Sequence, residues 1–191
     1  AVKSVGIDPS NGKELFYAKD GSYTYDFSYD DEVICGNTRP DVEVVIGSSL
    51  NWKGFSVSLN FRYQMGADVF NEALYSKVEN ISRSDLNKNQ DKRALYERWQ
   101  EEGDIVRFKN IASAETTPMS SRFVQEENVL TLESVYLGYE FYDGWIKKLG
   151  LSSLKFQVSM RDVFRASTIR SERGISYPFA RSMEAGLSFN F

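Results

Sequence analysis

The last eleven residues of the chain, 181–191, alternate between apolar and polar side chains. The apolar positions are the odd ones, at Met183, Ala185, Leu187, Phe189 and Phe191. Because successive side chains of a β-strand point to opposite faces, this pattern predicts a strand with one apolar and one polar face. The last strand of a soluble β-sandwich would alternate in the same way, so this stretch alone leaves open whether protein or lipid covers the apolar face.

Four further segments have strand patterns, and they cover residues 42–50, 54–65, 129–142 and 152–164. The second is the most regular, since its odd positions from Phe55 to Met65 are apolar and its even positions from Ser56 to Gln64 are polar. Its length matches the ~9–11 residues that a tilted strand needs to cross a bilayer. In the third segment the apolar phase changes near Glu133, which predicts a β-bulge or a strand that leaves the membrane there.

The connections between these segments differ strongly in length. Residues 51–54 and 143–151 form short links, whereas residues 66–128 and 165–180 are expected to be long extracellular loops without a convincing strand. The residues before the first segment are rich in turn signals, with one short strand expected at Glu14–Tyr17. All short links fall at one end of the predicted sheet, where aromatic residues gather: Trp52, Phe55, Tyr139, Phe141, Trp145, Phe189 and Phe191. Short turns, long loops and an aromatic girdle are typical of outer-membrane β-barrels.

Composition narrows the classes of function. Mean hydropathy is −0.43, but a transmembrane barrel has a similar average because lipid-facing and lumen-facing residues alternate. No apolar run approaches the ~18–20 residues of a transmembrane helix. The net charge of −4, without a basic cluster, argues against nucleic acid as a partner. The single cysteine, Cys35, and the absence of histidine exclude an internal disulfide, a His/Cys metal site and the usual catalytic triads. We therefore expect neither an enzyme nor a cofactor or metal.

Together these features predict an all-β fold, an antiparallel transmembrane β-barrel located in the outer membrane. Five strands do not close a barrel, because the smallest bacterial barrels have eight. Alone, such a sheet would leave two unpaired edges and an exposed apolar face. The chain begins with Ala1 and contains no signal segment. We expect residues 1–191 to be the C-terminal portion of a larger barrel, with the lipid bilayer and the remaining barrel strands as neighbours.

Six segments stand in a specific order and spacing: residues 6–9, 36–40, 98–104, 121–139, 149–159 and 177–191. This arrangement resembles the end of SusC/RagA-type TonB-dependent transporters. The resemblance implies a barrel of about 22 strands, plugged by an N-terminal domain that this chain lacks. It also implies a SusD-like surface lipoprotein, energy from TonB through the plug segment, and import of glycans or peptides. Residues 107–110 and 161–164 depart from the family's pattern, which leaves the ligand preference open.

The candidate substrate-binding residues fall into two groups. Five polar side chains are expected to face the lumen and to suit sugar hydroxyls or peptide carbonyls: Asn60, Arg62, Gln64, Arg161 and Arg165. Plug contacts and solvation of the lumen are the simpler explanation for them. In the first long loop, whose residues 68–78 and 91–101 have some helical character, Tyr96 and Trp99 are candidates for stacking on a sugar or packing against a lipoprotein. The simpler explanation for these two is that they hold the loop together.

The closing strand carries a further candidate motif. Leu187, Phe189 and Phe191 are expected to form the signal that the barrel-assembly machinery reads, although Phe191 could equally be a girdle residue alone. Two other classes remain for the whole chain. One is a soluble all-β carbohydrate-binding module, and the other is a passive porin or a siderophore-type receptor.

Overall fold

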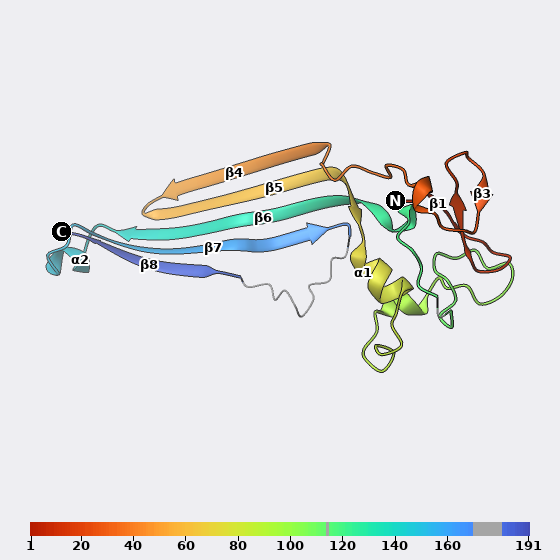
Figure 1. Ribbon diagram of the computed structural model, residues 1–191. Helices are drawn as coiled ribbons and strands as arrows, with labels where there is room; N and C mark the ends of the chain where they lie inside the picture. Colours follow the sequence, from red (N-terminus) through yellow and green to blue (C-terminus); the bar gives the residue numbers. More distant parts are fainter. Residues whose placement is uncertain (114, 170–180) are drawn as a thin grey trace. The chain divides into compact units, whose positions relative to one another are not determined.

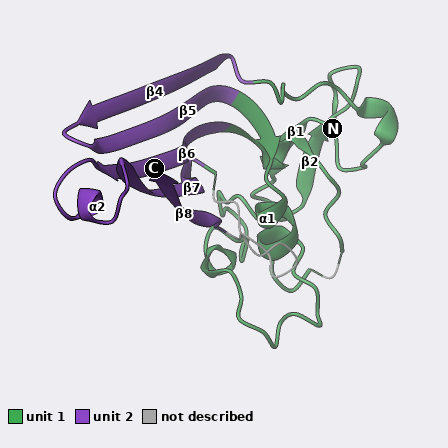
Figure 2. Ribbon diagram, turned by 90° about the vertical axis from the view of Figure 1, so that its left-hand side faces the viewer, with its two compact units in different colours: residues 1–39, 67–126, 169–172 green, residues 40–66, 127–168, 173–191 purple. Residues whose placement is uncertain are grey.

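The computed structural model describes residues 1–113, 115–169 and 181–191 of the chain. These residues form two compact units, coloured separately in Figure 2. Unit 1 consists mainly of Ala1–Arg39 and Ala67–Glu126, and unit 2 mainly of Pro40–Gly66, Glu127–Thr168 and the closing strand. None of the described helices is both long enough and apolar enough to cross a membrane.

A five-stranded sheet in the order β4-β5-β6-β7-β8 accounts for most of unit 2 (Figure 1). Its strands are β4 Val42–Trp52, β5 Phe55–Phe70, β6 Val124–Phe141, β7 Ser153–Ser167 and β8 Met183–Asn190. The spatial order follows the sequence, and the pairs β4–β5, β6–β7 and β7–β8 are antiparallel. The predicted antiparallel sheet is therefore present, and within the described residues β4 and β8 each have only one neighbouring strand.

The register of the strands gives the sheet two chemically different faces. Directly opposed residues of neighbouring strands share a face, and Ile46 lies opposite Phe61 while Leu50 lies opposite Val57. Rows of apolar side chains continue across β6, β7 and β8: Tyr139, Phe156 and Leu187 in one row, and Leu137, Val158 and Ala185 in the next. The intervening rows are polar, because Gln157 lies opposite both Gly138 and Gly186.

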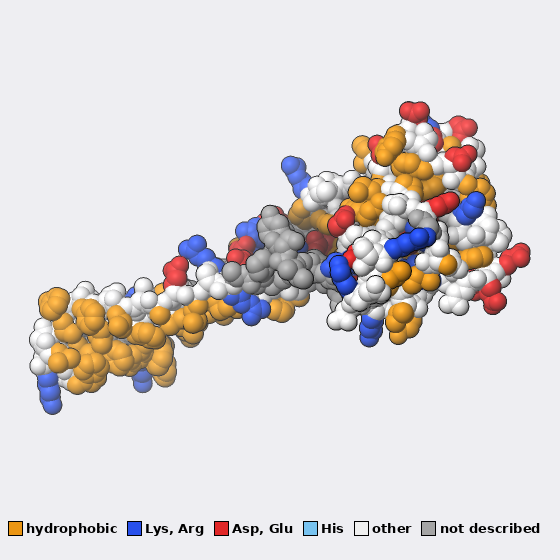
Figure 3. Space-filling model, turned by 60° about the horizontal axis from the view of Figure 1, so that its bottom comes forward, with side chains coloured by type: hydrophobic (Ala, Val, Ile, Leu, Met, Phe, Trp, Pro, Cys, Tyr) orange, Lys and Arg blue, Asp and Glu red, His pale blue; other side chains and the backbone are white. Residues whose placement is uncertain are grey.

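The apolar face is uncovered. Ile46 is 59% exposed, Leu50 63% and Leu187 59%. In Figure 3 hydrophobic side chains gather over the end of the sheet that carries the short connections. The buried hydrophobic cluster of the described residues lies instead in unit 1, where it consists of Leu74, Val78, Ala94, Phe108 and Phe123. Within the described residues, the apolar face of the sheet is therefore not packed into a hydrophobic core.

A tight turn and a chain of aromatic rings mark the end of the sheet with short connections. The residues between β4 and β5 are Lys53 and Gly54, whose φ angles of 47° and 88° are both positive, as a two-residue hairpin turn requires. Next to it the rings of Phe55 and Tyr139 lie 4.4 Å apart. Contacts between rings continue through Phe141 to Trp145 at the start of helix α2 (Trp145–Lys148).

A β-bulge interrupts the pairing of β6 with β7 near Glu133, where the sequence predicts an irregularity. Leu132 pairs with Phe164 and Ser134 with Arg161, so two residues of β7 lie opposite one residue of β6. The extra residue is on β7, where Asp162 has a φ of 51°. The phase change in the sequence of β6 thus indicates the position of the bulge but not the strand that carries the additional residue.

Unit 1 contains a small antiparallel sheet in the order β1-β2-β3 and several short helices. The strands are β1 Ser4–Ile7, β2 Glu14–Tyr17 and β3 Tyr23–Thr24. The helices are η1 Tyr29–Asp31, α1 Glu72–Leu74, η2 Tyr75–Glu79, η3 Lys92–Leu95 and η4 Ser121–Phe123. Asn71 begins α1, because its side chain accepts a hydrogen bond of 3.0 Å from the backbone N–H of Leu74.

Two predicted loop boundaries are wrong. The range 66–128 includes the end of β5 and the start of β6, since Gly66, with a φ of 82°, breaks the alternation without ending the strand. The rest of that range contributes the hydrophobic cluster of unit 1. The range 165–180 begins inside β7, which continues to Ser167. Residues 170–180 lie outside the described part of the chain.

Candidate functional site

The polar face of the sheet brings together three of the predicted lumen residues. Asn60 Nδ2 donates a hydrogen bond of 2.8 Å to Ser134 Oγ on β6, and Arg161 on β7 lies opposite Ser134 in the register. Arg62 forms ion pairs with Glu133, at 2.5 Å, and with Glu43. Carboxylates of β4 and β6, the strands on either side of β5, thus compensate the charge of Arg62.

The other two predicted residues of this group lie on the same strands. Gln64 is opposite Glu43 in the register of β4 and β5. Arg165 Nη2 donates to Glu127 Oε1 at 3.1 Å, and Ser167 Oγ donates to the same oxygen at 2.6 Å. Arg165 is therefore engaged by its own sheet, whereas the register places Arg161 opposite Ser134.

Trp99 and its neighbour Arg98 anchor the first long loop of unit 1. The indole Nε1–H of Trp99 donates a hydrogen bond of 3.0 Å to the carbonyl of Pro9, and its ring lies against Gly12. Arg98 is 7% exposed and donates to the carbonyls of Ala94, at 2.6 Å, and Val78. Burial lowers the pKa of the Arg98 guanidinium. These contacts fit the explanation that Trp99 holds the loop, while Tyr96 is 60% exposed.

The three predicted barrel-assembly residues lie at the edge of the sheet. Leu187 and Phe189 pair with Phe156 and Leu154 on β7, so they belong to the apolar face. Phe191 follows the last residue of β8 and is 93% exposed.

A buried ion network in unit 1 has no counterpart in the sequence prediction. Arg122 Nη2 donates to Glu14 Oε2 at 2.9 Å and to Glu79 Oε1 at 2.6 Å. The side chain of Glu79 is fully buried and that of Glu14 is 6% exposed. Burial lowers the pKa of Arg122, but its hydrogen bonds with the two carboxylates outweigh burial and raise that pKa overall. One guanidinium thus joins β2, η2 and η4.

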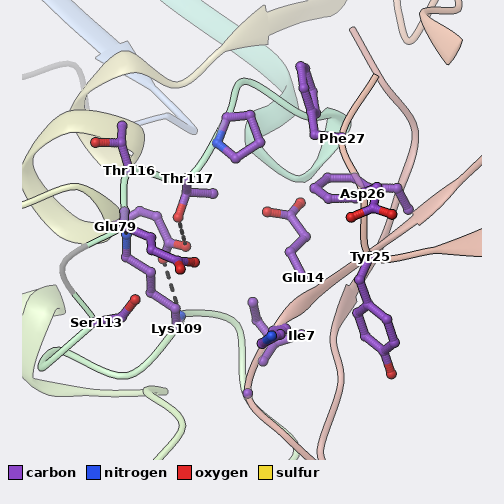
Figure 4. A pocket seen from close by; sticks show the side chains of 15 residues that line it. Ile7, Glu14, Tyr25, Asp26, Phe27, Glu79, Lys109, Ser113, Thr116 and Thr117 are labelled. Atoms are coloured by element: carbon purple, nitrogen blue, oxygen red, sulfur yellow. Dashed lines mark hydrogen bonds between the residues drawn. The ribbon is translucent and has the colours of Figure 1, made fainter. Parts of the chain in front are cut away.

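A cavity of about 310 Å³ lies beside this network, within unit 1 (Figure 4). Glu14 is directed into it from one side, and Glu79 and Lys109 lie on the other. Lys109 Nζ donates to Asn80 Oδ1 at 3.1 Å and to the carbonyl of Glu115. Burial lowers the pKa of Lys109, although the negative charge of Glu79 acts in the opposite direction. Spacing in the sequence does not reveal this group, because its members are far apart along the chain.

Comparison with known proteins provides the last observation. No protein-family model matches the sequence. Two TonB-dependent receptors of Formosa agariphila, P39 and P3, are 24% and 23% identical to it. The two alignments are 157 and 204 residues long and cover 80% and 96% of the chain. Chains of the RagAB peptide importer in the open-open and closed-closed states share its fold, with TM-scores of 0.76 and 0.74 at 19% identity, and both cover 100% of the chain. The resemblance to SusC/RagA-type transporters is confirmed.

The match is to a fragment of such a protein. The chain spans 15% and 19% of the two receptors and 22% of the RagAB chains that it matches. None of these relatives is named as an enzyme: they are receptors and an importer. In a SusC/RagA-type fold, the polar rows with Asn60, Arg62 and Arg161 and the loop unit with Glu14 and Lys109 are the two candidate places for ligand contact.

Proposed function

We propose that this chain forms part of the wall of an outer-membrane TonB-dependent transporter that imports nutrient oligomers, glycans or peptides. The observation that carries the proposal is the exposed apolar face of the sheet, with Ile46, Leu50 and Leu187. The opposite face of the same sheet is polar and carries the ion pairs of Arg62. In water such a face would be a large unfavourable surface, whereas in a bilayer it is the surface that lipid requires. Alternation of this kind is what a barrel wall needs.

The free edges of β4 and β8 support completion by further strands, as in a closed barrel of about 22 strands. With closure, the polar rows would line the lumen. Asn60, Gln64 and Arg161 would then offer hydrogen-bond donors and acceptors to cargo or to a plug. Arg62 and Arg165 already have carboxylate partners, so we assign them mainly to shaping the wall.

The proposed partners follow from the same family. Energy would come from TonB through a plug segment outside this chain, and a SusD-like surface lipoprotein would cover the outer side. The barrel-assembly machinery would read Leu187, Phe189 and Phe191. RagAB is named as a peptide importer, and the hydrogen-bond donors and acceptors of the polar face suit both peptide carbonyls and sugar hydroxyls.

The alternatives make different demands on the sheet. A soluble all-β carbohydrate-binding module would have to bury the apolar rows, and within the described residues they are uncovered. A siderophore-type receptor would share the barrel but differ in its loops.

The test uses the full-length protein in its own host. Cells producing a tagged protein are fractionated, and uptake of fluorescent oligosaccharides and peptides is measured with and without TonB and the neighbouring lipoprotein. We expect the tagged protein in the outer-membrane fraction, extractable only with detergent, and uptake that stops without TonB. A protein that is soluble without detergent, or uptake that persists without TonB, would refute the proposal.

A further inference from the structure

The cavity beside the Arg122 network is lined by both apolar and polar side chains. Ile7, Phe16 and Phe27 are apolar lining residues, with Ile7 and Phe16 only 7% and 3% exposed. The rings of Phe16 and Phe27 meet edge to face, 5.7 Å apart. Glu14 points into the cavity from the side of Ile7, and Lys109 lies opposite, so polar groups reach the cavity from two sides. At about 310 Å³ the cavity is at the small end of the ~300–1,000 Å³ range of ligand sites, so it has room for one ring and not for a long segment of oligomer.

We propose that this cavity is a subsite for a single uncharged, hydroxyl-rich ring, such as one sugar residue of an imported oligomer. The inference rests on the proposed transport function and assigns the first contact with cargo to the loop unit instead of the polar rows of the sheet. A pyranose ring has C–H faces and a rim of hydroxyl groups, which matches a cavity lined by both apolar and polar side chains.

Charged groups of both signs surround the cavity. Glu14 and Glu79 share the guanidinium of Arg122, and the ammonium of Lys109 interacts electrostatically with Glu79. Lys13, Asp26 and Glu115 also line the cavity, so four carboxylates and three cations of the protein surround it. An anionic ligand would be repelled by the excess of carboxylates, and a cationic ligand would compete with Lys13, Lys109 and Arg122. A hydroxyl group can donate a hydrogen bond to a carboxylate and accept one from an ammonium group.

Hydrogen-bonding capacity remains on both polar side chains. Glu14 accepts from Ser120 Oγ at 2.5 Å through one oxygen and from Arg122 through the other, which leaves further lone pairs on a carboxylate with about four acceptor sites. Lys109 Nζ has three protons and donates to Asn80 and Glu115, so one donor is left. Both groups are held in place before a ligand arrives, which reduces the entropy lost on binding.

The test is direct binding to the detergent-solubilised full-length transporter with its lipoprotein, by isothermal titration calorimetry. The probes are maltohexaose, xylohexaose and cellohexaose as neutral oligomers, oligogalacturonate as an anionic oligomer and pentalysine as a cationic one. We expect at least one neutral hexaose to bind more tightly than the charged probes. Lys109→Met removes a charge-assisted hydrogen bond and should weaken that binding about tenfold or more.

Two more variants separate a lost contact from a misfolded loop. Thr116→Trp places a large side chain at an exposed position of the cavity rim and should abolish binding without disturbing the core. Lys88→Met removes an exposed lysine whose salt bridge is with Asp85, and it should bind like wild type.

Each outcome decides between the proposals. Unchanged hexaose affinity in both Lys109→Met and Thr116→Trp, a preference for either charged probe, or no binding of any neutral hexaose would overturn the subsite. If uptake still depends on TonB in those cases, only the subsite is wrong. A wild-type protein that neither binds nor imports any oligomer refutes the transport function as well.

Discussion

The replacement Arg122→Met tests whether the buried ion network holds unit 1 together. It leaves Glu79, whose side chain is fully buried, and Glu14, which is 6% exposed, without their cation. Removing one partner of a buried ion pair typically costs about 3–5 kcal/mol. Because ~1.4 kcal/mol corresponds to a factor of ten in an equilibrium constant, local opening of the unit should increase by about a hundredfold to a few thousandfold.

The measurement is amide hydrogen exchange of the detergent-solubilised transporter, followed in peptides that cover η2 at Tyr75–Glu79. Its control is Arg107→Met, because the ion pair between Arg107 and Glu97 spans 3.6 Å and both side chains are more than half exposed. Exposed pairs contribute at most ~1 kcal/mol, so the control should change exchange by less than about fivefold. If Arg122→Met alters the exchange of these peptides no more than the control does, the network does not stabilise the unit. A double variant with Glu79→Gln should recover part of the loss, since it removes the unpaired buried charge.

Three further predictions concern packing, membrane insertion and assembly. Gly12→Ala places a Cβ 2.5 Å from the indole of Trp99, so the tryptophan emission should shift. Its control is Gly21→Ala, because Gly21 has a similar positive φ but no atom within 4 Å of the added Cβ. The control should lower stability by ~1–2 kcal/mol without shifting the emission. Val158→Arg puts a charge on the apolar face, which costs ~2–4 kcal/mol at the bilayer midplane, so less folded protein should reach the outer membrane. Ser159→Arg puts the same charge on the polar face and should insert normally. Equal yields of the two variants would contradict the assignment of faces. Deleting Phe191 should lower the outer-membrane yield, and unchanged insertion would count against its role as a signal.

The sheet could be predicted from the sequence because its information is local. In β5 the strict alternation from Phe55 to Met65 defines both faces, and the turn at Lys53 and Gly54 sets the register with β4. The same alternation in β8 continues the apolar rows of β7. Alternation with a period of two is visible within one strand, so each of these strands can be predicted without knowing its neighbour.

Unit 1 could not be predicted in this way because its core is assembled from distant segments. Leu74 and Val78 have helical spacing, but Phe108 lies outside the described helices and strands and Phe123 belongs to a three-residue helix. The ion pairs of Arg122 reach 43 residues back to Glu79 and 108 residues back to Glu14. No local pattern joins such positions, and a charged residue in a loop ordinarily indicates solvation.

The candidate ligand residues divide along the same line. Asn60, Arg62 and Arg161 are candidates because a polar position in an alternating strand has only one face to occupy. The ion pairs of Arg62 with Glu43 and Glu133 depend on which strands are neighbours, and that is not visible in the pattern of one strand. Trp99 stands out in the sequence by its aromatic side chain, whereas its contact with Pro9 depends on the fold of the first residues.

The bulge at Asp162 bears on how proteins with this sheet can change in length. Removing one residue from a regular strand would exchange the positions that face lipid and lumen for everything beyond the cut. Insertions and deletions should therefore accumulate in twos along β4 and β8. Opposite Glu133, β7 already accommodates a single extra residue. This is therefore the site where a designer could insert or remove one residue without exchanging the two faces of the strand.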